Sequence, residues 1–485
     1  MNSPVLMFAL PLLAAFLLPL AYRLSAPLGM ALGPLVLGIN VLLGLSAWAT
    51  VADSTIVIAL GGFQPPFGIT FHVDGLALLF AIAVSLGILL LWPAEGEGDA
   101  RVRTSTLALV LAAAGTGLAL SGDLFNIYVF YELTAVASYG LAAARGTGAA
   151  MAATMRYVVI SSFGAAMMLI GIALVYMVTG TLNLAHLAQL APGTLDGPLG
   201  LAAFVFILIG AGVKAELFPV NTWVPEVYAT APTRVSGLLA GVVSKLALLI
   251  IVRLLVLVFQ QPEALTVMLV LGILGVVTGE LAAWRARDFN RMLAYSSIGQ
   301  LGIMFIAFSI PGKAGIFAGL AVALHHLVVK PALFLLAERW DGSLTNLAGA
   351  ARSSPFASAL FILLALSLIG VPPLPGFWAK LLVLVELGEQ AQPVYYLGGI
   401  VILAGAVLEA NYLFRVASRF YRAETDLPAP ATHRMPDLAR AGLLALGLVA
   451  SVFVLTPLAE QLEGIASQAA DASQYIDAVN PGALP

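Results

Sequence analysis

Long apolar stretches separated by short polar connections run through almost the whole sequence. An α-helix of about 20 apolar residues is long enough to cross about 30 Å of hydrocarbon. The pattern therefore predicts an all-α polytopic membrane protein with about fourteen transmembrane helices. We place these spans at 3–22, 28–50, 75–93, 104–121, 123–143, 152–179, 198–220, 231–257, 263–283, 289–310, 315–338, 356–388, 395–418 and 440–458.

Three segments need a separate interpretation. Residues 52–74 carry β-branched runs around Gly-Gly and Pro-Pro, which predicts an external β-hairpin. Residues 459–485 form a polar, Ala-rich tail, which suggests a short amphipathic helix on the outer face. Residues 3–22 have no basic segment before them and no small-residue cleavage site after them, so we expect a first span and not a signal peptide.

Proline interrupts two of the predicted spans. Pro219 and Pro225 fall in or just after the seventh span (198–220), and the twelfth (356–388) contains Pro372, Pro373 and Pro375. Proline lacks an amide donor and clashes with the preceding turn, so both helices should be broken. Carbonyls freed at mid-membrane depth need protein or water partners, which predicts a hydrated cavity at each break.

A weak internal repeat predicts the domain organisation. Lys214 beside Pro219 has its counterpart in Lys380 beside Pro375, and further matches share an offset of about 164–170 residues. A repeat of five spans must be inverted across the membrane, as in many transporters, although apolar helices can also resemble one another by chance. The expected parts are 1–103, with three spans and the hairpin, 104–257 and 258–420, the two inverted repeats, and 421–485, with the last span and the tail.

Composition supports the membrane class and excludes some chemistry. Hydrophobic residues make up 61% of the 485 and charged residues 10%, against about 25% charged in soluble domains. Cysteine is absent, which excludes disulfides, thiolate metal sites and a cysteine nucleophile. We expect no cofactor and no redox or hydrolytic site in this chain.

The distribution of arginine among the loops predicts the orientation of the chain in the membrane. The residues that follow odd-numbered spans are Arg23, Arg101, Arg103, Arg145, Arg234, Arg285, Arg287, Arg339, Arg352, Arg422, Arg434 and Arg440, whereas loops after even-numbered spans hold only Lys313. Basic loops stay on the cytoplasmic side, so both termini are expected outside, in a prokaryotic inner membrane.

The chain has only five lysines, and four of them fall inside or at the break of apolar segments: Lys214, Lys245, Lys330 and Lys380. A lysine at the centre of a membrane helix costs about 2.5–3.5 kcal/mol on insertion scales. Such placement indicates ionisable groups kept in the membrane for function, of which proton movement is the simplest.

Neighbouring residues extend this set. Glu132 lies midway along 123–143, and Lys214 is its natural partner, while Lys245 is central in 231–257. On 315–338, His326 and Lys330 are four residues apart and share a helix face, whereas His325 points about 100° away. Because the two histidines diverge, a His–Lys proton relay is favoured over a metal site.

The last candidates are Lys380 and Glu409. Glu409 lies deep in 395–418, where it is either the counter-charge of Lys380 or an exit group for protons. Other charged residues lie nearer span ends, and for these we expect snorkelling or surface pairs; they are Glu216, Glu280, Arg253 and Glu338.

At these residues the sequence resembles the antiporter-like subunits shared by Mrp-type cation/proton antiporters and respiratory complex I, and is most similar to the Mrp D subunit. The segments that carry the resemblance are Phe71–Ala77, Asp123–Glu132, Lys214 before Phe218-Pro219 and Trp223-Val-Pro225, Ser236–Lys245, Arg291–Gln300, His325–Lys330 and Pro372–Lys380.

The resemblance implies fourteen helices, two inverted five-helix repeats with helices seven and twelve broken, and a central hydrophilic axis. It also implies roles: an ion pair of Glu132 and Lys214, a central Lys245, a relay of His326 and Lys330, and a terminal Lys380, with the share of His325 open.

The expected function is proton translocation within a multi-subunit Mrp-type Na⁺/proton antiporter. Two alternatives remain: a proton-pumping module of a complex I-like or membrane-bound hydrogenase-like redox complex, and a proton-conducting partner in inorganic-carbon uptake. The expected partners are other membrane subunits, protons, Na⁺ as a candidate second ion, and the lipid bilayer, and not nucleic acid.

Overall fold

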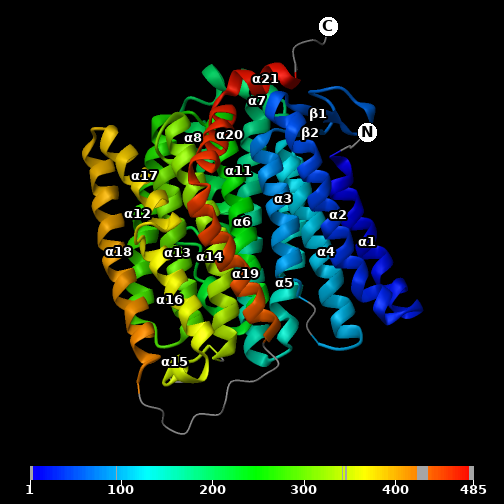
Figure 1. Cartoon of the computed structure of the whole chain (residues 1–485). Coiled ribbons are helices and arrows are strands. Elements are labelled where there is room, and N and C mark those ends of the chain that lie inside the picture. Colours follow the sequence, from blue (N-terminus) through cyan, green and yellow to red (C-terminus); the bar gives the residue numbers. More distant parts are fainter. Residues whose placement is uncertain (1–3, 94–95, 341, 345–346, 423–434, 480–485) are drawn as a thin grey trace. The chain divides into compact units, whose positions relative to one another are not determined.

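The computed structural model describes residues 4–93, 96–340, 342–344, 347–422 and 435–479 (Figure 1). Arg434, used above for orientation, lies outside these residues. Within them, eleven helices are long and apolar enough to cross a membrane, and three shorter apolar helices cover Gly75–Leu90, Pro198–Lys214 and Pro355–Ile369. Each predicted apolar stretch overlaps one of these helices. The chain is an all-helical, multi-pass membrane protein.

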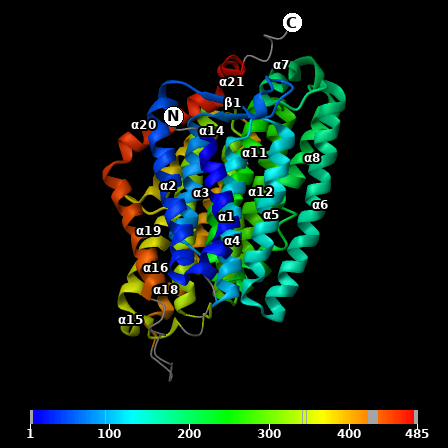
Figure 2. The same cartoon turned by 90° about the vertical axis from the view of Figure 1, so that its right-hand side faces the viewer.

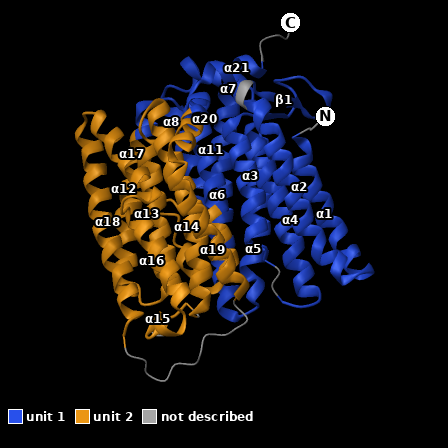
Figure 3. Ribbon diagram, in the orientation of Figure 1, with its two compact units in different colours: residues 1–215, 242–265, 464–485 blue, residues 216–241, 266–463 orange. Residues whose placement is uncertain are grey.

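The chain divides into two compact units, coloured separately in Figure 3. Unit 1 consists of residues 1–215, 242–265 and 464–485, and unit 2 of residues 216–241 and 266–463. Each unit therefore combines segments that are distant in sequence.

Unit 1 begins with paired helices. Within it α1 packs on α2 and α4, α4 packs on α5, and α6 lies along α8 (Figure 2). Its elements are α1 (Val5–Leu24), α2 (Ala26–Asp53), β1 (Ile56–Ala59), β2 (Thr70–Val73), α3 (Gly75–Leu90), α4 (Asp99–Leu120), α5 (Leu124–Ala142), α6 (Gly148–Thr179), α7 (Leu184–Thr194), α8 (Pro198–Lys214), α11 (Ser244–Leu257) and α21 (Ala472–Val479).

The segment 52–74 contains the two strands of the chain's described residues. They pair antiparallel, with Ile56 opposite Val73 and Ala59 opposite Thr70. Strand β2 leads directly to Asp74, whose carboxylate accepts a hydrogen bond from the Ala77 amide and caps α3. The hairpin therefore fixes the residues at the start of α3.

Unit 2 is built around α14, which packs on α13, α16, α17 and α19. Its elements are α9 (Val224–Thr230), α10 (Thr233–Leu238), most of α12 (Pro262–Arg285), α13 (Phe289–Phe308), α14 (Gly312–Arg339), α15 (Ala350–Ser353), α16 (Pro355–Ile369), α17 (Pro375–Glu389), α18 (Pro393–Arg419), α19 (Met435–Phe453) and most of α20 (Leu455–Ala470).

Both proline-rich segments interrupt the helices. Helix α8 ends at Lys214, and the chain is not helical again until Val224. Helix α16 ends at Ile369, and α17 begins at Pro375. Since proline supplies no amide donor, the last carbonyls of each first helix need other partners. At the second break a lysine meets this need.

The helix that carries Lys245 has a feature that the sequence pattern did not predict. Residues Leu239–Val243 form a π-helical turn between α10 and α11, directly before Ser244 and Lys245. Such turns inside α-helices are rare and are frequent at functional sites.

Candidate functional site

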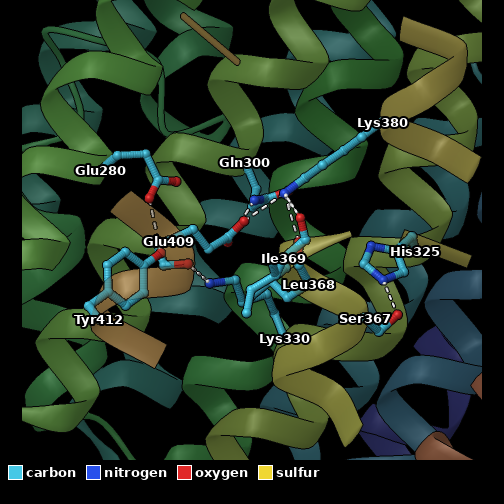
Figure 4. A network of polar contacts seen from close by, with 11 residues as sticks. Glu280, Gln300, His325, Lys330, Ser367, Leu368, Ile369, Lys380, Glu409 and Tyr412 are labelled. Atoms are coloured by element: carbon cyan, nitrogen blue, oxygen red, sulfur yellow. Dashed lines mark hydrogen bonds and ion pairs between the residues drawn. The ribbon is translucent and has the colours of Figure 1, made fainter. Parts of the chain in front are cut away.

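Unit 2 contains a cluster of buried charged side chains, shown in Figure 4. At its centre Lys380 Nζ on α17 lies 2.6 Å from Glu409 Oε2 on α18. The other carboxylate oxygen, Oε1, accepts a hydrogen bond of 2.9 Å from Gln300 Nε2 on α13. Of the two roles considered for Glu409, the structure therefore contains the counter-charge contact with Lys380.

Lys380 also bonds the end of α16, at the break between α16 and α17. Its Nζ donates to the carbonyls of Leu368 (2.7 Å) and Ile369 (3.2 Å), the last two residues of α16. These carbonyls have no partner within the helix, and the helix dipole places partial negative charge there. One ammonium thus bonds a carboxylate and a helix end at once.

Lys330 and the two histidines come from the middle of α14. Lys330 Nζ donates to Ser296 Oγ (2.6 Å) and to the Leu293 carbonyl (3.2 Å), both on α13. His325 Nε2 is hydrogen-bonded to Ser367 Oγ at 2.9 Å, so this side chain turns toward α16. His326 is fully buried, and because it lies four residues before Lys330 the two share one face of α14.

Sequence reasoning missed Glu280. We expected a snorkelling or surface residue, but its side chain is 1% exposed, and its Oε2 accepts a hydrogen bond of 3.1 Å from the Tyr412 hydroxyl. Glu216, placed in the same category, is also 1% exposed and accepts a bond from Tyr228. Distance from a span end is a poor guide to burial when other helices cover that end.

Unit 1 holds the remaining candidates. Lys214 ends α8 and is buried; its Nζ lies 3.2 Å from the centre of the Tyr131 ring on α5 and 3.5 Å from Ser161 Oγ on α6. Among the described residues no ion pair joins Lys214 to Glu132. Because Glu132 follows Tyr131 in sequence, it lies about 100° further round α5 and is only half-buried. The closest contact of the lysine ammonium on α5 is therefore the Tyr131 ring.

Lys245 lies on α11, immediately after the π-helical turn, and is 1% exposed. Its Nζ donates to Ser244 Oγ at 3.1 Å. Of the five lysines, only Lys313 is strongly exposed, in a surface pair with Glu463.

A second buried cluster in unit 1 joins the hairpin, α11 and α21. Arg253 on α11, for which we expected a surface position, forms a short ion pair with Asp74 at the start of α3. The His72 ring stacks on the Tyr475 ring of α21, with centroids 3.5 Å apart, and Arg253 lies over the same ring. The sequence signal for this cluster was the segment Phe71–Ala77, which carries part of the family resemblance and contains His72 and Asp74.

The electrostatics of this second cluster favour one charged pair and a neutral imidazole. Burial lowers the pKa of His72 to about 3, because the effect of lost hydration outweighs the attraction of Asp74. Burial alone would raise the pKa of Asp74, but the adjacent Arg253 guanidinium holds it below its usual value. The cluster therefore contains one buried salt bridge over a wide pH range.

Comparisons with known proteins agree on one family. The family model described as NADH:quinone oxidoreductase/Mrp antiporter, TM, matches residues 121–404. Among curated relatives, the N subunit of a NADH-quinone oxidoreductase from Desulforudis audaxviator is 32% identical over 494 residues, covering 95% of this chain and 97% of that protein. The D subunit of a Na(+)/H(+) antiporter from Alkalihalophilus pseudofirmus is 30% identical over 440 residues, covering 87% and 88%.

A solved structure gives the same result for the fold. A chain of the membrane-bound sulfane sulfur reductase, an archaeal respiratory membrane complex, superposes with a TM-score of 0.91 at 29% identity, and the match covers 99% of this chain and all of that one. The matched region of the family model includes every proton carrier predicted from the sequence except Glu409. This chain therefore belongs to the NADH:quinone oxidoreductase/Mrp antiporter transmembrane family.

Proposed function

We propose that this chain is the proton-translocating membrane subunit of a multi-subunit Mrp-type Na⁺/proton antiporter. The observation that carries the proposal is the burial of four lysines: Lys214, Lys245, Lys330 and Lys380 are 2%, 1%, 0% and 7% exposed. An ionised group in this position is costly, so in membrane helices it marks a proton or ion pathway by default.

In this proposal the protons pass along two groups of residues. The first group is Glu132, Lys214 and Lys245, and the second is His326, Lys330, Lys380 and Glu409, with His325 beside it. The fourteen helices, the two inverted repeats interrupted at the seventh and twelfth spans, and the placement of both termini outside belong to the same proposal. Their support is the arginine pattern, the two observed helix breaks and the family membership.

The mechanism we propose is an electrostatic relay. When Glu132 pairs with Lys214, the positive field at Lys245 falls and Lys245 takes up a proton. When the pair opens, Lys214 repels the charge on Lys245 and the proton leaves toward the second group. Two unit charges about 4 Å apart interact by about 4 kcal/mol at an effective dielectric constant of 20, enough to switch a lysine between states.

A second function is supported by specific relatives. The oxidoreductase N subunit and the sulfane sulfur reductase chain are both named as parts of redox complexes. The same relay could then serve a proton-pumping module driven by redox chemistry on other subunits. Purification in mild detergent separates the two, since small antiporter subunits would accompany the chain in one case and iron–sulfur subunits in the other.

The relay itself is tested in the complete complex reconstituted into proteoliposomes. Glu132→Ala and Lys245→Ala should each abolish ion-coupled proton movement, measured with a pH-sensitive dye, while the complex still assembles. Transport retained in both assembled variants would contradict the proposal.

A further inference from the structure

The buried carboxylate Glu280, which the relay above does not use, lies between two helices of unit 2. On α18, Gly405, Glu409 and Tyr412 fall at i, i+4 and i+7 and share one face. Tyr412 donates to Glu280, and a methyl group at Gly405 would lie 3.4 Å from Glu280 Cγ. Glu280 therefore faces the same side of α18 as Glu409, the partner of Lys380.

On its other side Glu280 packs against α13 at Gly299, where the absence of a side chain leaves room for the carboxylate. A methyl group at Gly299 would lie 2.3 Å from Glu280 Oε1. Among the described residues this oxygen accepts no hydrogen bond, since Tyr412 bonds to Oε2. A buried carboxylate oxygen without a protein partner is a natural acceptor for a water molecule or a proton.

A polar cavity lies near the carboxyl-terminal end of α12, the helix that carries Glu280. It has a volume of about 570 Å³ and lies where α12 connects to α13, lined by Ala282, Arg285, Arg287, Arg291 and Tyr295 among others. Tyr295 is four residues before Gly299 and shares its face of α13, about 6 Å along the axis. The arginine side chains that line the cavity make it polar, and a buried charge without water or a partner is costly, so water is the expected occupant.

We propose that Glu280 is a proton-carrying residue that connects the Lys380–Glu409 pair with water in this cavity. A proton on the Glu409 carboxyl passes, through the Tyr412 hydroxyl or a water, to the Glu280 carboxylate, which becomes a neutral acid. Glu280 then gives the same proton to water in the cavity, and the reverse sequence loads Glu409. The proposal rests on the proposed proton transport, and adds to it an opening at the arginine-rich end of α12.

Variants of Glu280 in the complete reconstituted complex test the first half of the proposal. Glu280→Gln keeps the shape but cannot ionise, so proton flux should fall about tenfold or more, and Glu280→Asp should retain a larger share. Flux within about twofold of wild type in assembled Glu280→Gln would overturn the proposal. If Lys380→Met abolishes flux while Glu280→Gln does not, this inference fails and the proposed function stands; if neither variant loses flux, both fail.

Cysteine chemistry tests the second half, and it does not depend on the stability of a Glu280 variant. The chain has no cysteine, so Ala282→Cys introduces a single thiol into the cavity. It should react quickly with a charged, water-soluble methanethiosulfonate, and the reaction should lower proton flux. Leu281→Cys is the matched control, because the neighbouring Leu281 is 46% exposed on the outer surface of unit 2 and outside the cavity lining. If Ala282→Cys did not react, or reacted without loss of proton flux, the proposed connection between the cavity and Glu280 would be wrong.

Discussion

Lys380 and Glu409 form a buried ion pair, with 2.6 Å between Nζ and Oε2, across the two helices α17 and α18. The same ammonium bonds the carbonyls at the broken end of α16. The pair therefore has two effects. Lys380 satisfies the carbonyls at the end of α16, and the ion pair keeps two ionisable groups together inside the membrane. Substitutions of Lys380 and Glu409 can separate the structural role of the pair from its functional role, because stability and proton flux should respond differently to them.

Removing one member of the pair should be worse for stability than removing both. Glu409→Gln leaves a buried ammonium without its counter-charge, and breaking such pairs costs about 3–5 kcal/mol. The double variant Lys380→Met with Glu409→Gln should recover much of this stability without recovering proton flux. Thermal unfolding of the detergent-solubilised complex measures the first effect, and a dye assay in proteoliposomes measures the second.

The control for this experiment is the exposed pair of Lys313 and Glu463, whose side chains are 45% and 53% exposed. Exposed pairs contribute about 0–1 kcal/mol, so Lys313→Gln should change neither stability nor flux appreciably. If Lys313→Gln lost as much stability as Glu409→Gln, burial of the ion pair would not be the cause of the destabilisation.

A side chain at Gly299 should disturb the packing of Glu280. A methyl group there would lie 2.3 Å from Glu280 Oε1, so Gly299→Ala must displace the carboxylate or the helix. We expect a destabilisation of about 1–3 kcal/mol together with reduced flux. The comparison is Gly447→Ala on α19, where nothing lies within 4 Å of the added atom; an equal effect at both sites would argue against the assigned packing.

The ring of Tyr131 should hold Lys214 in its present position. An ammonium 3.2 Å from the ring centre gains a cation–π attraction of about 2 kcal/mol in a site without water. Tyr131→Leu should therefore lower both stability and flux, whereas Tyr131→Phe keeps the ring and should restore most of the stability. Equal loss in the two variants would assign the effect to the hydroxyl, which donates to the Gly210 carbonyl.

Stability should fall in acid because His72 is buried as a neutral ring. Its pKa is about 3 when folded and 6.5 when unfolded, so between these values the unfolded chain binds the extra proton. The contribution is complete above pH 6.5 and is lost progressively as the pH falls toward 3. His72→Gln should flatten the dependence of Tm on pH in that interval. An unchanged slope would show that another group causes the loss of stability in acid.

The sequence predicted the parts of the structure that depend on local chemistry. Apolar length predicted the helices, and the prolines at 219 and 372–375 predicted the two breaks, because both effects act within a few residues. The pattern of β-branched residues around Gly-Gly likewise falls on the β1–β2 pair. The four lysines within apolar segments are all buried, because an ammonium in an apolar helix must turn toward the protein interior.

Contacts between helices could not be predicted in the same way. Which oxygen Lys380 reaches, and that Lys214 lies over the Tyr131 ring, depend on the rotation of each helix. Glu280 and Arg253 were assigned to the surface because only their distance from a span end was considered, and other helices cover them. The π-helical turn before Lys245 has no signature in the apolar pattern.

The most direct measurement compares the initial rate of proton flux through the complete complex carrying Lys380→Met with that of Lys313→Met, in proteoliposomes of equal protein content. The account predicts loss of at least about nine-tenths of the flux for Lys380→Met, with the complex intact, and a rate near wild type for Lys313→Met. Equal rates in the two variants would contradict the claim that the buried lysines carry protons.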